Sequence, residues 1–118
     1  DIVDRDLAVA VCAPEVPCGA YASDAIADTG LEPVTFERSV RGVVTKVVLD
    51  EVDAGIAYAS DVAAEPDLDE IPFPEADGVV ARYPIVAIDD GDLARAFVDF
   101  VGSAAGRAIL ADAGFGPP

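Results

Sequence analysis

The chain contains no histidine, methionine or tryptophan, and it has two cysteines among its 118 residues. Without histidine it lacks the commonest zinc ligand, the commonest general base and the serine–histidine triad. Two cysteines alone cannot complete a structural zinc site. These absences argue against a metal centre and leave carboxylates as the main groups available for catalysis.

Basic residues are also scarce. Seven Lys and Arg stand against 23 Asp and Glu, which gives a net charge of −16 at pH 7. A nucleic-acid partner needs clustered basic residues, and an anionic membrane attracts them, so we expect neither partner. The acidity is typical of a solubilising surface, and an acidic functional surface is the alternative. The scattered basic residues are Arg5, Arg38, Arg41, Lys46, Arg82, Arg95 and Arg107.

Long apolar runs are missing as well. None reaches the roughly 18 residues of a membrane span. The hydrophobic content of 53% nevertheless predicts a folded domain with a real core. The chain begins at Asp1, with neither Met nor a signal-peptide pattern, so we expect a processed or truncated product.

Strand-like and helix-like segments alternate along the chain. The run LAVAVC is apolar throughout, which is typical of a strand buried on both faces of a parallel sheet. This alternation predicts an α/β fold, with a mostly parallel sheet flanked by helices. The predicted strands are 7–12, 33–37, 53–59, 68–73 and 83–88.

Helix boundaries carry recognisable capping residues. Ser39 precedes a stripe of valines at helical spacing over 40–48, and Ser103 precedes a last helix that ends before Gly114. Further helices are predicted at 19–27 and 93–101. We also expect Ser60 and Asp61 to cap a short helix.

Two helix starts and one phenol are predicted at the carboxyl edge of the sheet, where α/β folds bind ligands. They are Pro17-Cys18-Gly19, Ser39-Val40-Arg41 and Tyr58. Helix N-termini have free backbone N–H groups and a partial positive charge, so they favour anions. A fully ionised tetrahedral oxyanion only accepts hydrogen bonds, whereas hydrogen phosphate also needs an acceptor. This donor-only set therefore favours molybdate, tungstate or sulfate.

The two cysteines, Cys12 and Cys18, lie six positions apart on either side of the first predicted turn. In an exported protein they form a disulfide that stiffens this turn. Two small, half-buried thiols are the alternative interpretation.

Five segments, in this order, resemble the periplasmic molybdate-binding proteins of ABC transporters, within the type II periplasmic binding proteins. They cover nearly the whole chain and are VPCGAYA at 16–22, SVR at 39–41, AGIAYASD at 54–61, YPIV at 83–86 and AGF at 113–115. The resemblance implies that Cys18 and Val40 donate backbone N–H groups to the oxyanion and that Tyr58 donates its hydroxyl. Gly19, Ser39 and Arg41 are secondary candidates. Arg41 as a solvated helix charge is the alternative.

The resemblance also implies how the chain is organised. Residues 1–90 correspond to the second of two lobes, and residues 91–118 to a helical segment that packs on the first lobe. The serines that the family's first lobe supplies have no counterpart here. The implied ligand is molybdate or tungstate, without a cofactor or a directly bound metal cation. The implied partner is a transporter permease, and the implied location is extracytoplasmic, as a periplasmic protein or a cell-surface lipoprotein.

Two other functions stay open at this point. One is an enzyme that uses paired carboxylates, such as Asp61 with Glu65 or Asp89 with Asp90. The other is a regulatory or interaction domain built on the same lobe. In addition, helices over 93–113 that lack the first lobe would expose Phe97, Phe100 and Ile109, so we expect them to repack, swap between chains or dimerise.

Overall fold

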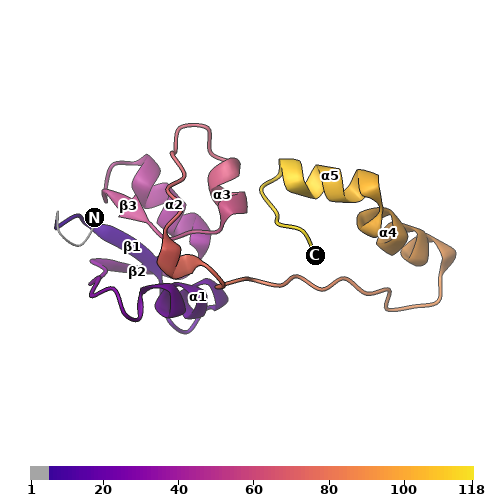
Figure 1. The fold of residues 1–118 in the computed structure, drawn as a ribbon, viewed down its shortest axis with the longest axis horizontal. Coiled ribbons are helices and arrows are strands. Elements are labelled where there is room, and N and C mark those ends of the chain that lie inside the picture. The colour runs from indigo at the N-terminus through magenta and orange to yellow at the C-terminus, as the bar shows by residue number, and fades with distance from the viewer. Residues whose placement is uncertain (1–5) are drawn as a thin grey trace. The chain divides into compact units, whose positions relative to one another are not determined.

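A three-stranded parallel sheet forms the centre of the first part of the molecule. The computed structural model describes residues 6–118, and its contacts divide the chain into two units, Asp1–Ala81 and Arg82–Pro118. The strands β1 (Val9–Cys12), β2 (Thr35–Glu37) and β3 (Ala54–Gly55) lie in the order β2-β1-β3 (Figure 1). Ala10 of β1 is opposite Thr35 of β2 and Gly55 of β3. All residues of the central strand β1 are buried, as its apolar sequence predicts.

The helices of the first unit cover both faces of this sheet. They are α1 (Pro17–Ile26), α2 (Val40–Val48) and α3 (Ala59–Ala63), followed by the 3₁₀ turn η1 (Pro74–Ala76). Successive side chains of a strand point to opposite faces. Accordingly, Ala10 and Cys12 pack with Val43 of α2, whereas Val9 and Val11 pack with Ala22 of α1. The predicted α/β fold with a parallel sheet flanked by helices is therefore confirmed.

Both ends of α2 are closed by capping interactions. At its start, the Ser39 hydroxyl accepts a hydrogen bond from the Gly42 N–H at 3.2 Å. At its end, the Glu51 N–H donates to the Lys46 carbonyl and the Asp50 N–H to the Val47 carbonyl. These two bonds form a Schellman motif, in which Asp50 adopts the left-handed conformation with a φ of 54°. The predicted Ser39 cap is thus confirmed.

The second unit consists mainly of two consecutive helices, α4 (Asp92–Gly102) and α5 (Ala104–Asp112). Ser103 lies between them, and its hydroxyl accepts from the Gly106 N–H, as predicted for the cap of the last helix. After α5, Gly114 has a φ of 83° and donates to the Ala111 carbonyl, so its predicted role at the helix end is confirmed. Apolar residues remain exposed on this unit: Leu93, Phe97, Phe100 and Ile109.

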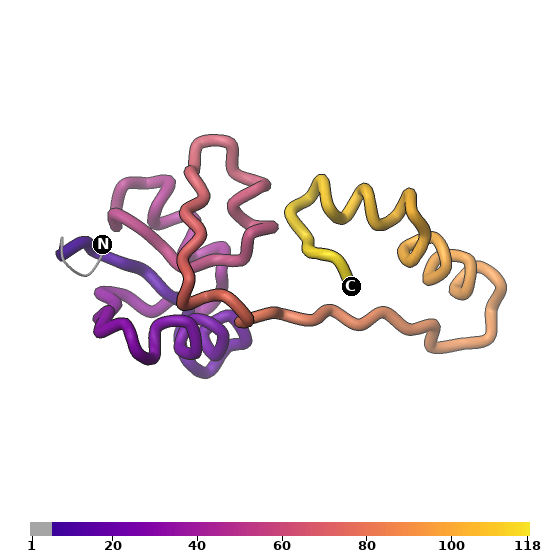
Figure 2. Tube along the Cα trace, in the orientation of Figure 1, coloured from indigo at the N-terminus to yellow at the C-terminus, as the bar shows by residue number. Residues whose placement is uncertain are grey.

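Two predicted strands are absent from the described residues. Residues 68–73 and 83–88 adopt neither helix nor strand, and the trace in Figure 2 shows the chain passing through them without coiling. A strand needs a neighbour to accept its hydrogen bonds, and within residues 6–118 only β2 and β3 pair with β1. Both segments also contain proline, which removes a backbone donor. The strand expected over 53–59 is likewise reduced to Ala54–Gly55.

Candidate functional site

Three helix N-termini lie at the carboxyl edge of the parallel sheet. Each strand of the first unit is followed by one helix: β1 by α1, β2 by α2 and β3 by α3. Because the strands are parallel, their carboxyl ends share one edge, and the helices that follow begin there. This topology gathers the predicted segments around Cys18, Val40 and Tyr58 at the same end of the first unit.

The loop between β1 and α1 is held in place by covalent and hydrogen bonds. Cys12 and Cys18 form the predicted disulfide, with their Cα atoms 5.6 Å apart. The Val16 N–H donates to the Ala13 carbonyl at 3.1 Å, and the Ala13 N–H donates to the Glu37 carbonyl at 2.8 Å. The second bond attaches the loop to the end of β2. The start of α1 is therefore fixed against two strands.

Gly19 is required by the close approach of α1 to this loop. A Cβ atom at this position would lie 1.8 Å from the Ala13 carbonyl oxygen and 2.9 Å from the Cys12 carbonyl oxygen. Real Cβ atoms do not approach backbone atoms so closely, so any side chain would move the helix away from the loop. The contribution of Gly19 is thus local packing next to Cys18.

The first turn of α1 leaves one backbone donor unused. Pro17 stands at the first helical position and has no N–H. Gly19 and Ala20 both donate to the Val16 carbonyl, at 2.9 and 3.2 Å. The Cys18 N–H donates to no other described residue. Cys18 therefore presents a single unpaired amide at the positive end of the helix.

The first turn of α2 has a similar arrangement. The Ser39 carbonyl and hydroxyl both accept from Gly42, and the carbonyl also accepts from Val43. Within the described residues, the N–H groups of Val40 and Arg41 have no acceptor. The side chain of Ser39 is engaged as the helix cap, although its hydroxyl hydrogen is still available to donate. The Arg41 side chain is exposed, and its guanidinium forms no ion pair with a described residue.

Tyr58 occupies the N-cap position of α3. Ser60 and Asp61, which we expected to cap this helix, lie within its first turn instead, and no side chain of the described part of the chain caps it. The Tyr58 ring is half-buried and meets the ring of Tyr21 edge to face, with centroids 6.1 Å apart. Sequence reasoning missed Tyr21 as a support. Its position three residues after Cys18 places both residues on one face of α1 and was the available signal.

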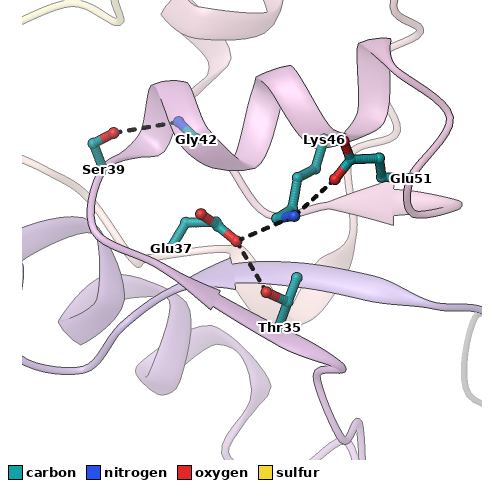
Figure 3. Close-up of polar contacts among 6 residues, drawn as sticks. All are labelled: Thr35, Glu37, Ser39, Gly42, Lys46 and Glu51. Atoms are coloured by element: carbon teal, nitrogen blue, oxygen red, sulfur yellow. Dashed lines mark hydrogen bonds and ion pairs between the residues drawn. The ribbon is translucent and has the colours of Figure 1, made fainter.

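A charged network on α2 lies apart from these donors. Lys46, in the last turn of α2, is 2.8 Å from Glu51 and 3.8 Å from Glu37, which also accepts from the Thr35 hydroxyl (Figure 3). The hydrogen bond with Glu51 is the main reason why the pKa of Lys46 is raised, with a smaller contribution from Glu37. Lys46 and Val40 lie at opposite ends of α2. This network therefore stabilises the C-terminal end of the helix and does not contribute to the donors at its N-terminus.

The two carboxylate pairs considered for catalysis differ in their contacts. Asp89 accepts from the Gly91 N–H, and Asp90 forms an ion pair with Arg95 at 2.7 Å. Asp61 and Glu65 line one pocket between α2 and α3.

Across residues 6–118, no group of three or more Cys, Asp or Glu side chains has the geometry of a metal site. Also within this range, no helix is long and apolar enough to cross a membrane.

Comparison with known proteins agrees with this architecture. The family described as bacterial extracellular solute-binding protein matches residues 1–116. The molybdate-binding proteins ModA of Mycobacterium bovis and Mycobacterium tuberculosis are 43% identical over 124 residues, which cover 100% of this chain and 48% of each relative. The chain thus spans about half the length of these curated relatives. No solved structure matches it. The chain belongs to the family of bacterial extracellular solute-binding proteins.

Proposed function

We propose that this chain supplies one side of an oxyanion-binding cleft in the solute-binding component of an ABC importer. The observation that carries the proposal is the unpaired Cys18 N–H, held at the start of α1 by the disulfide and by the packing of Gly19. The Val40 N–H and the Tyr58 hydroxyl would complete the donor set. All three belong to segments that begin at the carboxyl edge of the sheet.

The chemistry of these donors suits a fully ionised oxyanion. Two backbone N–H groups at helix starts and one phenol donate hydrogen bonds, and no carboxylate is among them. Hydrogen phosphate would bring a proton that this set cannot accept, whereas molybdate, tungstate and sulfate bring only acceptors. Aligned backbone dipoles would balance the anion's charge without a lysine, which fits a chain with a net charge of −16.

The names of the relatives support molybdate within this group, and tungstate is an oxyanion of the same charge and shape. Two mycobacterial proteins, each 43% identical to this chain, are named as molybdate-binding. We infer that this chain serves the same class of ligand, in a binding role without catalysis and without a cofactor. The partner would be a transporter permease. The disulfide suits an oxidising, extracytoplasmic location.

Only part of the site would come from this chain. We infer that residues 1–90 act as the second of two lobes and that residues 91–118 pack on the first lobe, which would provide the remaining donors. The exposed apolar side chains of α4 and α5, Phe97, Phe100 and Ile109, are the surface that such packing would cover.

Calorimetry on the protein expressed from its complete gene tests this function. Titrations with molybdate, tungstate, sulfate and phosphate should show tight binding of the first two, weaker binding of sulfate and no binding of phosphate. A protein that binds none of them, or that prefers phosphate, would contradict the proposal. The 118-residue chain alone should bind molybdate weakly or undetectably, because it holds only part of the donor set.

A further inference from the structure

Asp61 lines a pocket of about 240 Å³ between α2 and α3, and one of its carboxylate oxygens is buried and unsatisfied among the described residues. The Oδ2 atom of Asp61 is buried and has no hydrogen-bond partner among the described residues. A buried carboxylate oxygen without a partner is costly, because it has lost its water and gained nothing in return. A positively charged or donating group is therefore expected to meet it.

Arg41 is the basic residue that lines this pocket. The other charged side chain in the lining, besides Asp61, is Glu65, which has the same sign as Asp61 and cannot satisfy it. Arg41 is exposed and forms no ion pair with a described residue, so its guanidinium is available. Its long side chain and several donors suit a carboxylate better than the single hydroxyl of Thr45, which also lines the pocket.

The positions of these two residues connect them with the candidate site. Arg41 follows Val40 in the first turn of α2, and Asp61 lies three residues after Tyr58 in the first turn of α3. A contact between the two side chains would join the starts of both helices. It would also hold the guanidinium on the pocket side of α2.

We propose that Arg41 closes onto Asp61 across this pocket and so fixes the Val40 N–H relative to the Tyr58 hydroxyl. Arg41 is then a positioning residue and not a ligand of the oxyanion. The effect of the Arg41–Asp61 pair on molybdate affinity rests on the proposed function. The side-chain pair itself is a property of the ligand-free protein and can be tested without any ligand.

Substitutions separate this role from direct contact with the anion. Asp61→Asn and Arg41→Met, in the protein expressed from its complete gene, should each weaken molybdate binding roughly tenfold, and the double variant should bind no more weakly than either single variant. If Arg41 touched the anion directly, Asp61→Asn would remove a nearby negative charge and leave binding unchanged or tighter. That result, or fully additive losses, would overturn the proposal.

Two controls come from the same pocket, and a conservative variant tests the charge. Glu65→Gln removes an equivalent carboxylate and Thr45→Val removes the competing hydroxyl, so both should stay within about twofold of wild type. Arg41→Lys keeps the positive charge and should recover part of the affinity lost in Arg41→Met. If Thr45→Val loses as much molybdate affinity as Arg41→Met, the Thr45 hydroxyl and not Arg41 is the partner of Asp61.

A spectroscopic measurement on the wild-type protein avoids variants that fail to fold. In ¹⁵N-labelled, ligand-free protein, the Arg41 Nε–H signal should be protected from exchange with water, and addition of molybdate should change it little. A signal that is unprotected before molybdate and protected afterwards would overturn the proposal. If the protein binds neither molybdate nor tungstate, the proposed function fails, whereas this measurement still decides whether the pair exists.

Discussion

The ring of Tyr58 at the start of α3 packs edge to face against the ring of Tyr21 on α1, with an interplanar angle of 70°. This contact joins the helix that contains Cys18 to the residue that would provide the phenol. Aromatic pairs of this geometry contribute roughly 0.5–1.5 kcal/mol beyond their buried area. The relative positions of two proposed donors therefore depend on a residue that is not itself a donor.

Changes at these two tyrosines should separate donation from support. Tyr58→Phe removes only the hydroxyl and should weaken molybdate binding by about 1 kcal/mol, or roughly fivefold, since it deletes one hydrogen bond. Tyr21→Phe keeps the ring and should bind like wild type, whereas Tyr21→Ala should bind more weakly. Calorimetry measures all three, and equal losses in Tyr21→Phe and Tyr58→Phe would contradict the assigned roles.

Removal of the disulfide should affect both stability and binding. Replacing Cys12 and Cys18 together by Ser should lower the free energy of unfolding by roughly 2 kcal/mol, as the chain-entropy model gives for so short a loop. The Cys18 N–H should also become less well ordered, so molybdate affinity should fall. Urea unfolding and calorimetry, with the reduced wild type as the matched comparison, provide the measurements. Unchanged affinity in the double variant would show that the loop needs no cross-link.

A side chain at Gly19 should be poorly tolerated. Gly19→Ala places a Cβ atom against the Ala13 carbonyl, and we expect a loss of about 1–3 kcal/mol in stability together with weaker binding. Gly102 is a suitable control, because a Cβ atom there meets nothing within 4 Å. Gly102→Ala lies in α4 and should be neutral or slightly stabilising. If thermal unfolding shows the two variants to be equally stable, the close approach of α1 to the Ala13 carbonyl does not restrict position 19 to glycine.

Asp50 offers a site for stabilisation. It adopts a left-handed backbone with a φ of 54°, which glycine adopts without steric cost. Asp50→Gly should therefore raise the free energy of unfolding by about 0.5–1 kcal/mol. Asp50→Asn should change it little, because asparagine tolerates this conformation as well as aspartate does. A less stable glycine variant in urea unfolding would argue against this interpretation of the helix end.

The network around Lys46 predicts a dependence of stability on alkaline pH. The pKa of Lys46 is raised above its ordinary value of 10.5, so the folded protein holds this proton more tightly than the unfolded chain does. The stabilisation should be fully present below about pH 10 and lost as pH rises through the raised pKa. Urea unfolding from pH 7 to 11 should show that wild type is more stable than Lys46→Met and that this difference in the free energy of unfolding narrows toward pH 11. A difference in free energy that stays constant over this range would contradict the prediction.

The sequence predicted much of this fold because several signals are local. The buried strand β1, the Ser39 and Ser103 caps and the turn at Gly114 each depend on a few neighbouring residues. The prediction of strands at 68–73 and 83–88 was wrong, because a strand depends on a partner strand and apolar composition does not reveal whether one is present. Asp50 was missed because a left-handed helix end normally calls for glycine or asparagine.

The candidate site was predictable in part for the same reason. Helix starts that follow parallel strands were accessible from the alternation of segments, whereas the N–H groups of Cys18 and Val40 were named from the resemblance to the molybdate-binding proteins. The aromatic support by Tyr21 and the unsatisfied oxygen of Asp61 depend on how α1, α2 and α3 pack together. Such packing between elements is set by the whole fold and leaves no short motif.

The N–H groups at the starts of α1 and α2 that have no acceptor among the described residues belong to the main chain, so only exchange for proline removes them. Alanine at position 40 would consequently leave the Val40 donor intact and would miss it, whereas alanine at position 18 would keep the N–H but break the disulfide. An amide-to-ester replacement in the backbone, introduced by chemical synthesis or ligation, would delete each donor individually. Over evolutionary time, the same property allows the side chain at position 40 to drift while the recognition chemistry persists.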